Sequence, residues 1–497
     1  MRRSWGTVDE RTPDPVGRAR PSVTTAAEAG GRADVEVLAL SGGSLADLTL
    51  LGAVGVVLAG VLLLMARMPR LAFAGWLVVL CFVPVWVGIT FVVGLEGHVV
   101  ATVGLLLSVL PGLVRGNLLT PPKLTWGDAL FAAFLVVTLV AVLSGRVTFS
   151  ATFVACVQWA AAFLAGRLVG YRVRLSWVYG ALAVAFTVVA VLALVEFAVG
   201  WNPFLGISGD SSLRGTWGVV EFRGGGGRTE GAFGHSIALG AGLALAVPLA
   251  LAAPFRTAVR LPMVLLMLAA TVVTFSRIGL VTAALGAVLA VLFLGSDLPR
   301  RLRVAVSAGL VVVGIAFAPL VSGVFAAAGS EAANSAGYRL QLLALLPDLQ
   351  PFGWASTAYQ VAGQTVLANV PTTDGLLQTI DNALLLVGLS YGWVPLVVLL
   401  LGLLMAVRCL VSGRVTAPTV SLVAQIPAFA TVALITQYST FTWFVAGLAV
   451  FSQSVVTRES DIPTWPGDTR TPSAAERRQG SPELVDGNTG TLSGALR

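Results

Sequence analysis

A short segment that ends at the start of an apolar run contains three residue types that could bind a charged ligand or transfer a proton. It reads Arg228-Thr-Glu-Gly-Ala-Phe-Gly-His-Ser236 and presents Arg228, Glu230 and His235 at a membrane boundary. The glycine run before it, Gly224–Gly227, lacks the Lys-Ser/Thr of a nucleotide-binding P-loop. For His235, a helix-start residue bonded to the backbone is the simpler alternative to a catalyst.

A second segment, Thr274-Phe-Ser-Arg-Ile-Gly279, contains Ser276 and Arg277. It interrupts an apolar run over about 261–295, which is too long for one membrane span. We therefore expect two short helices that meet there in a tight outer turn. A charge at this depth usually faces a cavity or a partner. The alternative is an arginine that extends toward lipid phosphates.

A third group of residues lies in the second long polar stretch. Arg339 begins a predicted amphipathic helix that stops at Pro347. The stretch ends at Asp381 and Asn382, where the chain re-enters an apolar run. The simpler interpretation of this last pair is a helix N-cap.

The spacing places three arginines, Arg228, Arg277 and Arg339, and the carboxylate of Asp381 at the same boundary. Guanidinium groups match phosphate oxygens bidentately, so an anionic ligand that bears phosphate is expected. A carboxylate among cations stays ionised. It could then accept a proton from a sugar hydroxyl.

The remaining chemistry of the chain points away from metals, cofactors and nucleic acids. Cys81, Cys156 and Cys409 are isolated, and the chain has two histidines, so no metal site or disulfide framework is expected. The net charge of +7 is explained by basic residues in short loops that fix membrane topology, not by nucleic-acid binding.

The elements that must position these residues are transmembrane helices. The chain of 497 residues is 56% hydrophobic and 11% charged, and its apolar runs are continuous instead of alternating. We expect an all-α polytopic bundle of about 12–13 spans over 44–458. The predicted spans are 48–66, 71–94, 99–114, 128–144, 149–169, 177–199, 235–253, 261–276, 278–295, 304–325, 383–407, 418–437 and 439–456.

Basic residues in alternate short connections set the expected orientation. The positive-inside rule makes that side cytoplasmic and leaves two long loops outside, about 200–234 and about 326–382. The polar tails 1–43 and 459–497 are expected to be disordered. The first tail has no apolar stretch near its start, so a cleaved signal peptide is not expected. The basic connections contain Arg167, Arg172 and Arg174; Arg256 and Arg260; Arg300, Arg301 and Arg303; and Arg408 and Arg414.

In order along the chain, these segments resemble the O-antigen ligase and polymerase superfamily of bacterial membrane glycosyltransferases. The resemblance covers roughly 130–455 and includes the two long loops. Its pieces are R-T-E-G-A-F-G-H-S at Arg228–Ser236, T-F-S-R-I-G at Thr274–Gly279, Y-R-L-Q-L-L-A-L-L-P-D-L-Q-P-F-G-W at Tyr338–Trp354, and D-N-A-L-L-L-V-G-L-S-Y-G at Asp381–Gly392.

The resemblance implies a multi-pass protein of the plasma membrane. Its donor would be a glycan on a polyprenyl pyrophosphate, and its acceptor a sugar hydroxyl on the outer face. Transfer would proceed without a metal or nucleotide and with inversion. Arg228, Arg277 and Arg339 would hold the pyrophosphate and stabilise it as it leaves. The catalytic residues would be Arg277, Arg339 and the base Asp381. Arg228, Glu230, His235, Ser276 and Asn382 would line the substrate site.

One departure concerns the base. Ligases of this superfamily have His-Asn where this chain has Asp381-Asn382, and an aspartate can perform the same proton abstraction. A polysaccharide polymerase is therefore preferred over a ligase, and His235 is a second candidate base. The alternatives are a transporter or flippase for an amphipathic anion and another polyprenyl-dependent glycosyltransferase class. The latter typically carries an acidic pair for a metal in an early outer loop, which here holds only Glu96 and His98.

Overall fold

The computed structural model describes ten stretches of the chain. The described residues are 64–90, 94–116, 118–223, 226–294, 298–327, 342–343, 345–353, 358–361, 364–367 and 378–461, all within the compact unit Ala59–Arg497. The first tail and the second tail beyond residue 461 lie outside these residues, as do Arg339 and most of the predicted helix that follows it.

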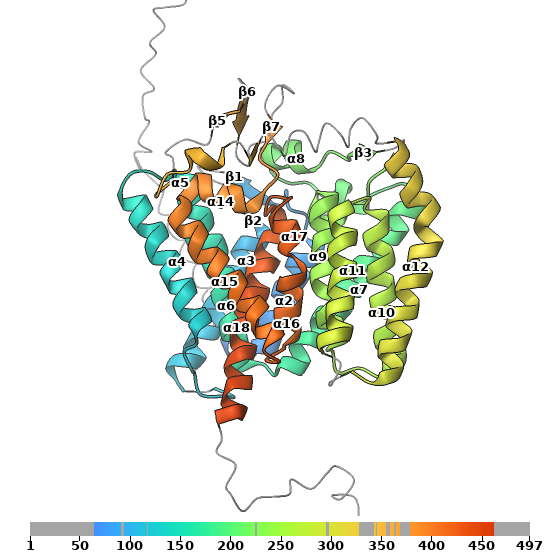
Figure 1. The fold of residues 1–497 in the computed structure, drawn as a ribbon, viewed down its shortest axis with the longest axis horizontal. Helices are drawn as coiled ribbons and strands as arrows, with labels where there is room; N and C mark the ends of the chain where they lie inside the picture. The colour runs from blue at the N-terminus through green and yellow to red at the C-terminus, as the bar shows by residue number, and fades with distance from the viewer. Residues whose placement is uncertain are drawn as a thin grey trace, which may run out of the picture. The chain divides into compact units, whose positions relative to one another are not determined.

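The protein is an all-α helical bundle, as the sequence predicts (Figure 1). Its strands are short, and each sheet joins two or three of them within a loop. The principal helices are α2 (Pro69–Phe82), α3 (Gly97–Val114), α4 (Trp126–Leu143), α5 (Phe149–Phe153), α6 (Ala160–Arg172), α7 (Leu175–Val199), α9 (Ser236–Leu251), α10 (Thr257–Val273), α11 (Arg277–Phe293), α12 (Arg300–Ala327), α14 (Ala383–Tyr391), α15 (Trp393–Val411), α16 (Ala417–Ala424), α17 (Ile426–Phe429) and α18 (Thr436–Asp461).

Six helical segments in the described part of the chain are long and apolar enough to cross a membrane, and five more are apolar but shorter. This makes the chain a membrane protein, while the total of 12–13 spans stays a prediction. The six long segments are Gly97–Val114, Trp126–Leu143, Phe149–Arg172, Leu175–Val199, Trp393–Val411 and Thr436–Val456.

Three predicted spans have different boundaries in the structure. The span over 71–94 ends as a helix at Phe82, just before Pro84, and β1 (Gly88–Thr90) and β2 (Gly94–Glu96) form a hairpin there. The span over 383–407 is broken at Gly392, whose φ of 108° no helix allows. The span over 418–437 is helical only to Phe429, and α18 begins at Thr436.

The break at Gly392 is stabilised by residues from the second long loop. The amide of Trp393 donates to the carbonyl of Gln350 at 2.9 Å, and Val394 donates to Pro351 at 3.3 Å. These amides begin α15 and have no partner within their own helix. A side chain at Gly392 would overlap the backbone of Pro351 and Phe352. The loop therefore completes the hydrogen bonding that the break would leave open.

Consecutive long helices traverse the bundle in alternating directions, so alternate connections lie at the same end. We call one of the two ends the basic end, because its connections hold Arg172 and Arg174, Arg256 and Arg260, and Arg408 and Arg414. The opposite end, the loop end, receives residues 200–235, the strands β5 to β7 and the N-terminus of α14 (Figure 1).

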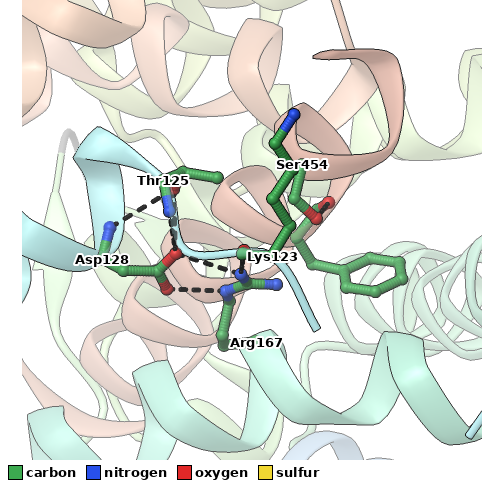
Figure 2. Close-up of polar contacts among 6 residues, drawn as sticks. Lys123, Thr125, Asp128, Arg167 and Ser454 are labelled. Atoms are coloured by element: carbon green, nitrogen blue, oxygen red, sulfur yellow. Dashed lines mark hydrogen bonds and ion pairs between the residues drawn. The ribbon is translucent and has the colours of Figure 1, made fainter. Parts of the chain in front are cut away.

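A buried ion pair fixes α4 to α6 at the basic end. The guanidinium of Arg167, 4% exposed, donates to Asp128 at 2.7 and 3.0 Å and to the carbonyl of Lys123 at 2.7 Å (Figure 2). Asp128 also forms a capping box with Thr125. Because a buried charge is costly without partners, these bonds hold the start of α4 firmly.

Helix α9 is the centre of the bundle. Every residue from Ala238 to Leu251 is buried, against α7, α10, α11, α16 and α18. A helix that is apolar on all sides belongs in a core, because no face of it needs solvent. The N-terminus of α9 at Ser236 therefore brings the first candidate segment to the middle of the loop end.

Candidate functional site

The side chain at the centre of the site is Glu221, which the sequence analysis did not single out. A short hairpin, β3 (Phe222–Arg223) with β4 (Gly226–Gly227), turns the chain back and places Glu221 beside Arg228. The guanidinium Nη1 of Arg228 lies 2.5 Å from Glu221 Oε2. His235 Nε2 lies 3.3 Å from Oε1, and Ser236 donates at 3.4 Å.

Electrostatics keep Glu221 ionised. Burial by itself would raise the pKa of this carboxyl, but its hydrogen bond with His235 and the charge of Arg228 lower it to about 2. A group with so low a pKa is a poor proton acceptor near neutral pH. Glu221 is paired with Arg228 and His235, which favours a positioning role.

Glu230 lies behind this pair and is 2% exposed. Burial raises its pKa to about 8, and the nearby carboxylates of Glu221 and Glu196 contribute to the rise. Its Oε1 accepts the backbone amide of Glu221 at 3.0 Å. The predicted substrate-binding residue Glu230 is thus buried and holds the hairpin, which favours a positioning role.

Two further polar residues, also missed from the sequence, lock the turn that follows. The carboxylate of Glu196, at the end of α7, accepts the amides of Glu230 and Gly231 at 3.1 and 3.0 Å. Asn202 donates to the carbonyl of Gly231 at 3.1 Å. Glu196 is an isolated acidic residue inside an apolar run, and this pattern in the sequence could have identified it as a candidate.

His235 is the N-cap of α9, as the simpler interpretation predicts. Its Nδ1 accepts the amide of Ile237 at 3.2 Å. The remaining hydrogen is therefore on Nε2, which is directed at Glu221. His235 is 20% exposed at its side chain, so it still borders the site.

The second segment forms the predicted tight turn between α10 and α11. Phe275 adopts a φ of 51°, which is strained for a bulky residue and reverses the chain within the turn. Ser276 is buried, and its hydroxyl caps α11 by accepting the amide of Gly279 at 3.1 Å. Arg277 is the first residue of α11 and is half-buried.

The two segments meet. Arg228 Nε donates to the carbonyl of Thr274 at 3.3 Å, and Gly240 of α9 packs on Gly279 of α11. A Cβ on Gly240 would lie 2.9 Å from the Thr274 hydroxyl, so only glycine permits this approach. The N-termini of α9 and α11 therefore lie side by side, and their dipoles add positive potential beside the two arginines.

The third predicted pair is at the same loop end. Asn382 caps α14 by accepting the amide of Leu385 at 2.9 Å and donates to the carbonyl of Ala430 at 2.8 Å. Ala430 follows α17, which packs on α11. Asp381, half-buried, precedes this cap. The N-cap interpretation is confirmed for Asn382, while the role of Asp381 stays a prediction and Arg339 lies outside the described residues.

Within the part of the chain that the structure describes, no three His, Cys, Asp or Glu residues are grouped as metal ligands. The site combines cations, helix N-termini and one ionised carboxylate, a set that suits an anion. Comparison with models of protein families, with curated proteins and with solved structures found no match for this chain.

Proposed function

We propose that the protein is a membrane glycosyltransferase of the plasma membrane. It transfers a glycan from a polyprenyl pyrophosphate to a sugar hydroxyl on the outer face, which corresponds to the loop end. One observation carries the proposal: Arg228 and Arg277 lie where the N-termini of α9 and α11 meet. This arrangement supplies several fixed donors and positive dipoles for a pyrophosphate.

In the proposed reaction, the arginines act on the leaving group and Asp381 acts on the acceptor. The acceptor oxygen attacks the anomeric carbon while the bond from that carbon to the pyrophosphate oxygen breaks. Arg228, Arg277 and Arg339 stabilise the charge that develops on the departing polyprenyl pyrophosphate. The proton of the acceptor hydroxyl passes to the carboxylate of Asp381. Attack opposite the leaving group inverts the anomeric centre, and no metal is required.

Among such transferases we favour a polysaccharide polymerase. Asp381 occupies the position where ligases of the resembling superfamily carry histidine. Asn382 caps α14 whichever base precedes it, so the substitution leaves the helix start intact. His235 is the second candidate base. Its Nδ1 is engaged by Ile237, which makes it the weaker one.

A transporter or flippase for an amphipathic anion is the second candidate. The observation that favours it is the pair of broken helices, α14–α15 at Gly392 and α16–α17 at Gln425, because transporters commonly bind substrate at such breaks. Gln425 is fully buried, and its side-chain oxygen accepts the hydroxyl of Tyr438 at 3.0 Å. That bond between helices gives the residue a structural use without a substrate.

The test is glycan extension from a labelled lipid-linked oligosaccharide in proteoliposomes. Arg277→Ala should lower the rate by about a hundredfold or more, in the range of a lost oxyanion donor. Asp381→Asn should lose activity if Asp381 is the base. Arg256→Ala, an exposed arginine at the basic end, is the matched control. Wild-type product length in Arg277→Ala would refute the proposal. Lipid movement across the bilayer without extension would favour the transporter.

A further inference from the structure

A second feature of the fold begins beside Asn382 at the loop end and extends away from the candidate site. Helices α4, α14, α15, α16 and α18 enclose an elongated cavity of about 550 Å³. Its lining begins at the loop end with Ala383 and Leu434 and continues past Phe131 and Trp443. It finishes at the basic end with Lys123 and Arg414. The cavity thus extends through most of the bundle.

The walls of this groove suit a hydrocarbon chain. Most of the lining consists of Leu, Val, Ala, Phe, Met and Trp side chains, and the few polar groups include the hydroxyl of Thr442 and the amide of Gln453. Helices α4 and α15 are the least buried of the long spans, at 22% and 17% of their residues. Two walls of the groove are therefore the long spans most exposed to lipid, while core residues such as Phe131 and Trp443 form its inner side.

The charge of the lining is concentrated at one end. Lys123 and Arg414 are the charged residues among those that line the cavity, and both are cations at the basic end. Trp126, 74% exposed, stands beside them at the first turn of α4. Exposed tryptophan beside Lys or Arg is typical of the headgroup level of a membrane.

Both cations are attached to rigid backbone. The carbonyl of Lys123 accepts a hydrogen bond from buried Arg167 (Figure 2), which also grips Asp128 in the first turn of α4. The carbonyl of Arg414 accepts Gln453 Nε2 at 2.7 Å, and Gln453 also donates to Thr419. The mouth of the groove is therefore fixed by side chains from α6 and α18.

We propose that this groove binds one anionic phospholipid from the leaflet at the basic end. Its phosphate lies between Lys123 and Arg414, and an acyl chain follows the apolar lining. Basic pockets between transmembrane helices bind anionic headgroups in this way. The glycosyl donor is a less suitable occupant, since its pyrophosphate belongs at the loop end, where the groove lining is uncharged. The cations that would hold the phosphate, Lys123 and Arg414, lie at the basic end, so the proposal stands without the proposed function.

The test compares lipids retained by the purified full chain in native mass spectrometry. The protein is exchanged into detergent with dioleoyl phosphatidylglycerol or dioleoyl phosphatidylcholine. Wild type should retain one phosphatidylglycerol in preference to phosphatidylcholine. Lys123→Ala with Arg414→Ala should reduce that retention by about thirtyfold, roughly fivefold for each cation. Arg256→Ala, the exposed arginine at the same end but outside the groove, should leave it unchanged.

A second variant tests the chain-binding part independently of charge. Gly402 lines the groove, and a Cβ there would meet no atom within 4 Å, so we expect Gly402→Leu to extend into the groove. It should also release the lipid, whereas Gly75→Leu, equally unobstructed and outside the groove, should not. Equal retention by wild type and the double variant would overturn the proposal. Equal losses of phosphatidylglycerol in the double variant and in Arg256→Ala would also overturn it. A bound polyprenyl phosphate that is displaced only by Gly402→Leu would overturn it as well.

Discussion

Arg228 and Glu221 form an ion pair in which Nη1 and Oε2 are 2.5 Å apart, across the mouth of a two-stranded hairpin. The arginine is 6% exposed at its side chain, while the glutamate is 41% exposed. Glu221 therefore neutralises a buried cation from the solvent side. A phosphate that enters the site must share Arg228 with this carboxylate.

Removal of Glu221 should lower the stability of the protein, because Arg228 would then be a buried cation without this partner. Glu221→Ala leaves Arg228 and His235 without their common acceptor, and we expect a loss of about 1–3 kcal/mol, moderated because the glutamate is partly solvated. Thermal unfolding of the purified protein measures it. Glu221→Ala with Arg228→Leu should be more stable than the sum of the single variants predicts. Strict additivity would show that the pair is not coupled.

The pH dependence of the protein's stability should reveal the protonation of the Glu230 carboxyl. Its pKa is about 8 in the fold against 4.5 for the free side chain. Between these values the folded protein keeps the proton that the unfolded chain loses. The contribution to stability is therefore fully present below pH 4.5 and declines as the pH rises to about 8, by at most about 1.4 kcal/mol per pH unit.

Glu230→Gln imitates the protonated carboxyl and can still accept the amide of Glu221. We expect its melting temperature to change less than that of wild type between pH 5 and pH 8.5. Tryptophan fluorescence in detergent is a suitable readout. The same pH dependence in both proteins would assign the proton to another group.

The contact between α9 and α11 should tolerate no side chain. Gly240→Val would bring its Cβ to 2.9 Å from the Thr274 hydroxyl and 3.2 Å from Ser276 Cβ, and would separate the two helix starts. We expect a cost of about 1–3 kcal/mol and weaker binding of pyrophosphate. Gly104→Val is the control, because a Cβ at Gly104 would meet no atom within 4 Å. Equal melting temperatures in the two variants would contradict the close approach.

The helical, membrane-spanning character of the chain followed from its apolar runs, because each span is long and uniform. The break before β1 had a visible cause in Pro84. The break at Gly392 did not, since one glycine in an apolar run is common in membrane helices. It depends on the carbonyls of Gln350 and Pro351, which only the folded loop brings there.

The candidate site was accessible from the sequence only in part. Arg228, Ser276 and Arg277 were found because a charge or cap interrupts apolar sequence, and the structure brings their segments together. Glu221 was missed because its position depends on the β3–β4 hairpin. The glycine run in this segment does not by itself predict a hairpin. Local spacing identifies ionisable residues but cannot pair them across a turn whose geometry is not yet known.

The loop that completes the break at Gly392 has one more consequence. Gly353 packs on the backbone of Ser390 near the end of α14, and Ile380 is buried with Leu385 and Leu389, so both ends of the loop lie against this helix. The entropic cost of lengthening a loop whose two ends are held in place is small. The contacts at Gly353 and Ile380 can therefore be kept while the length of the loop between them changes.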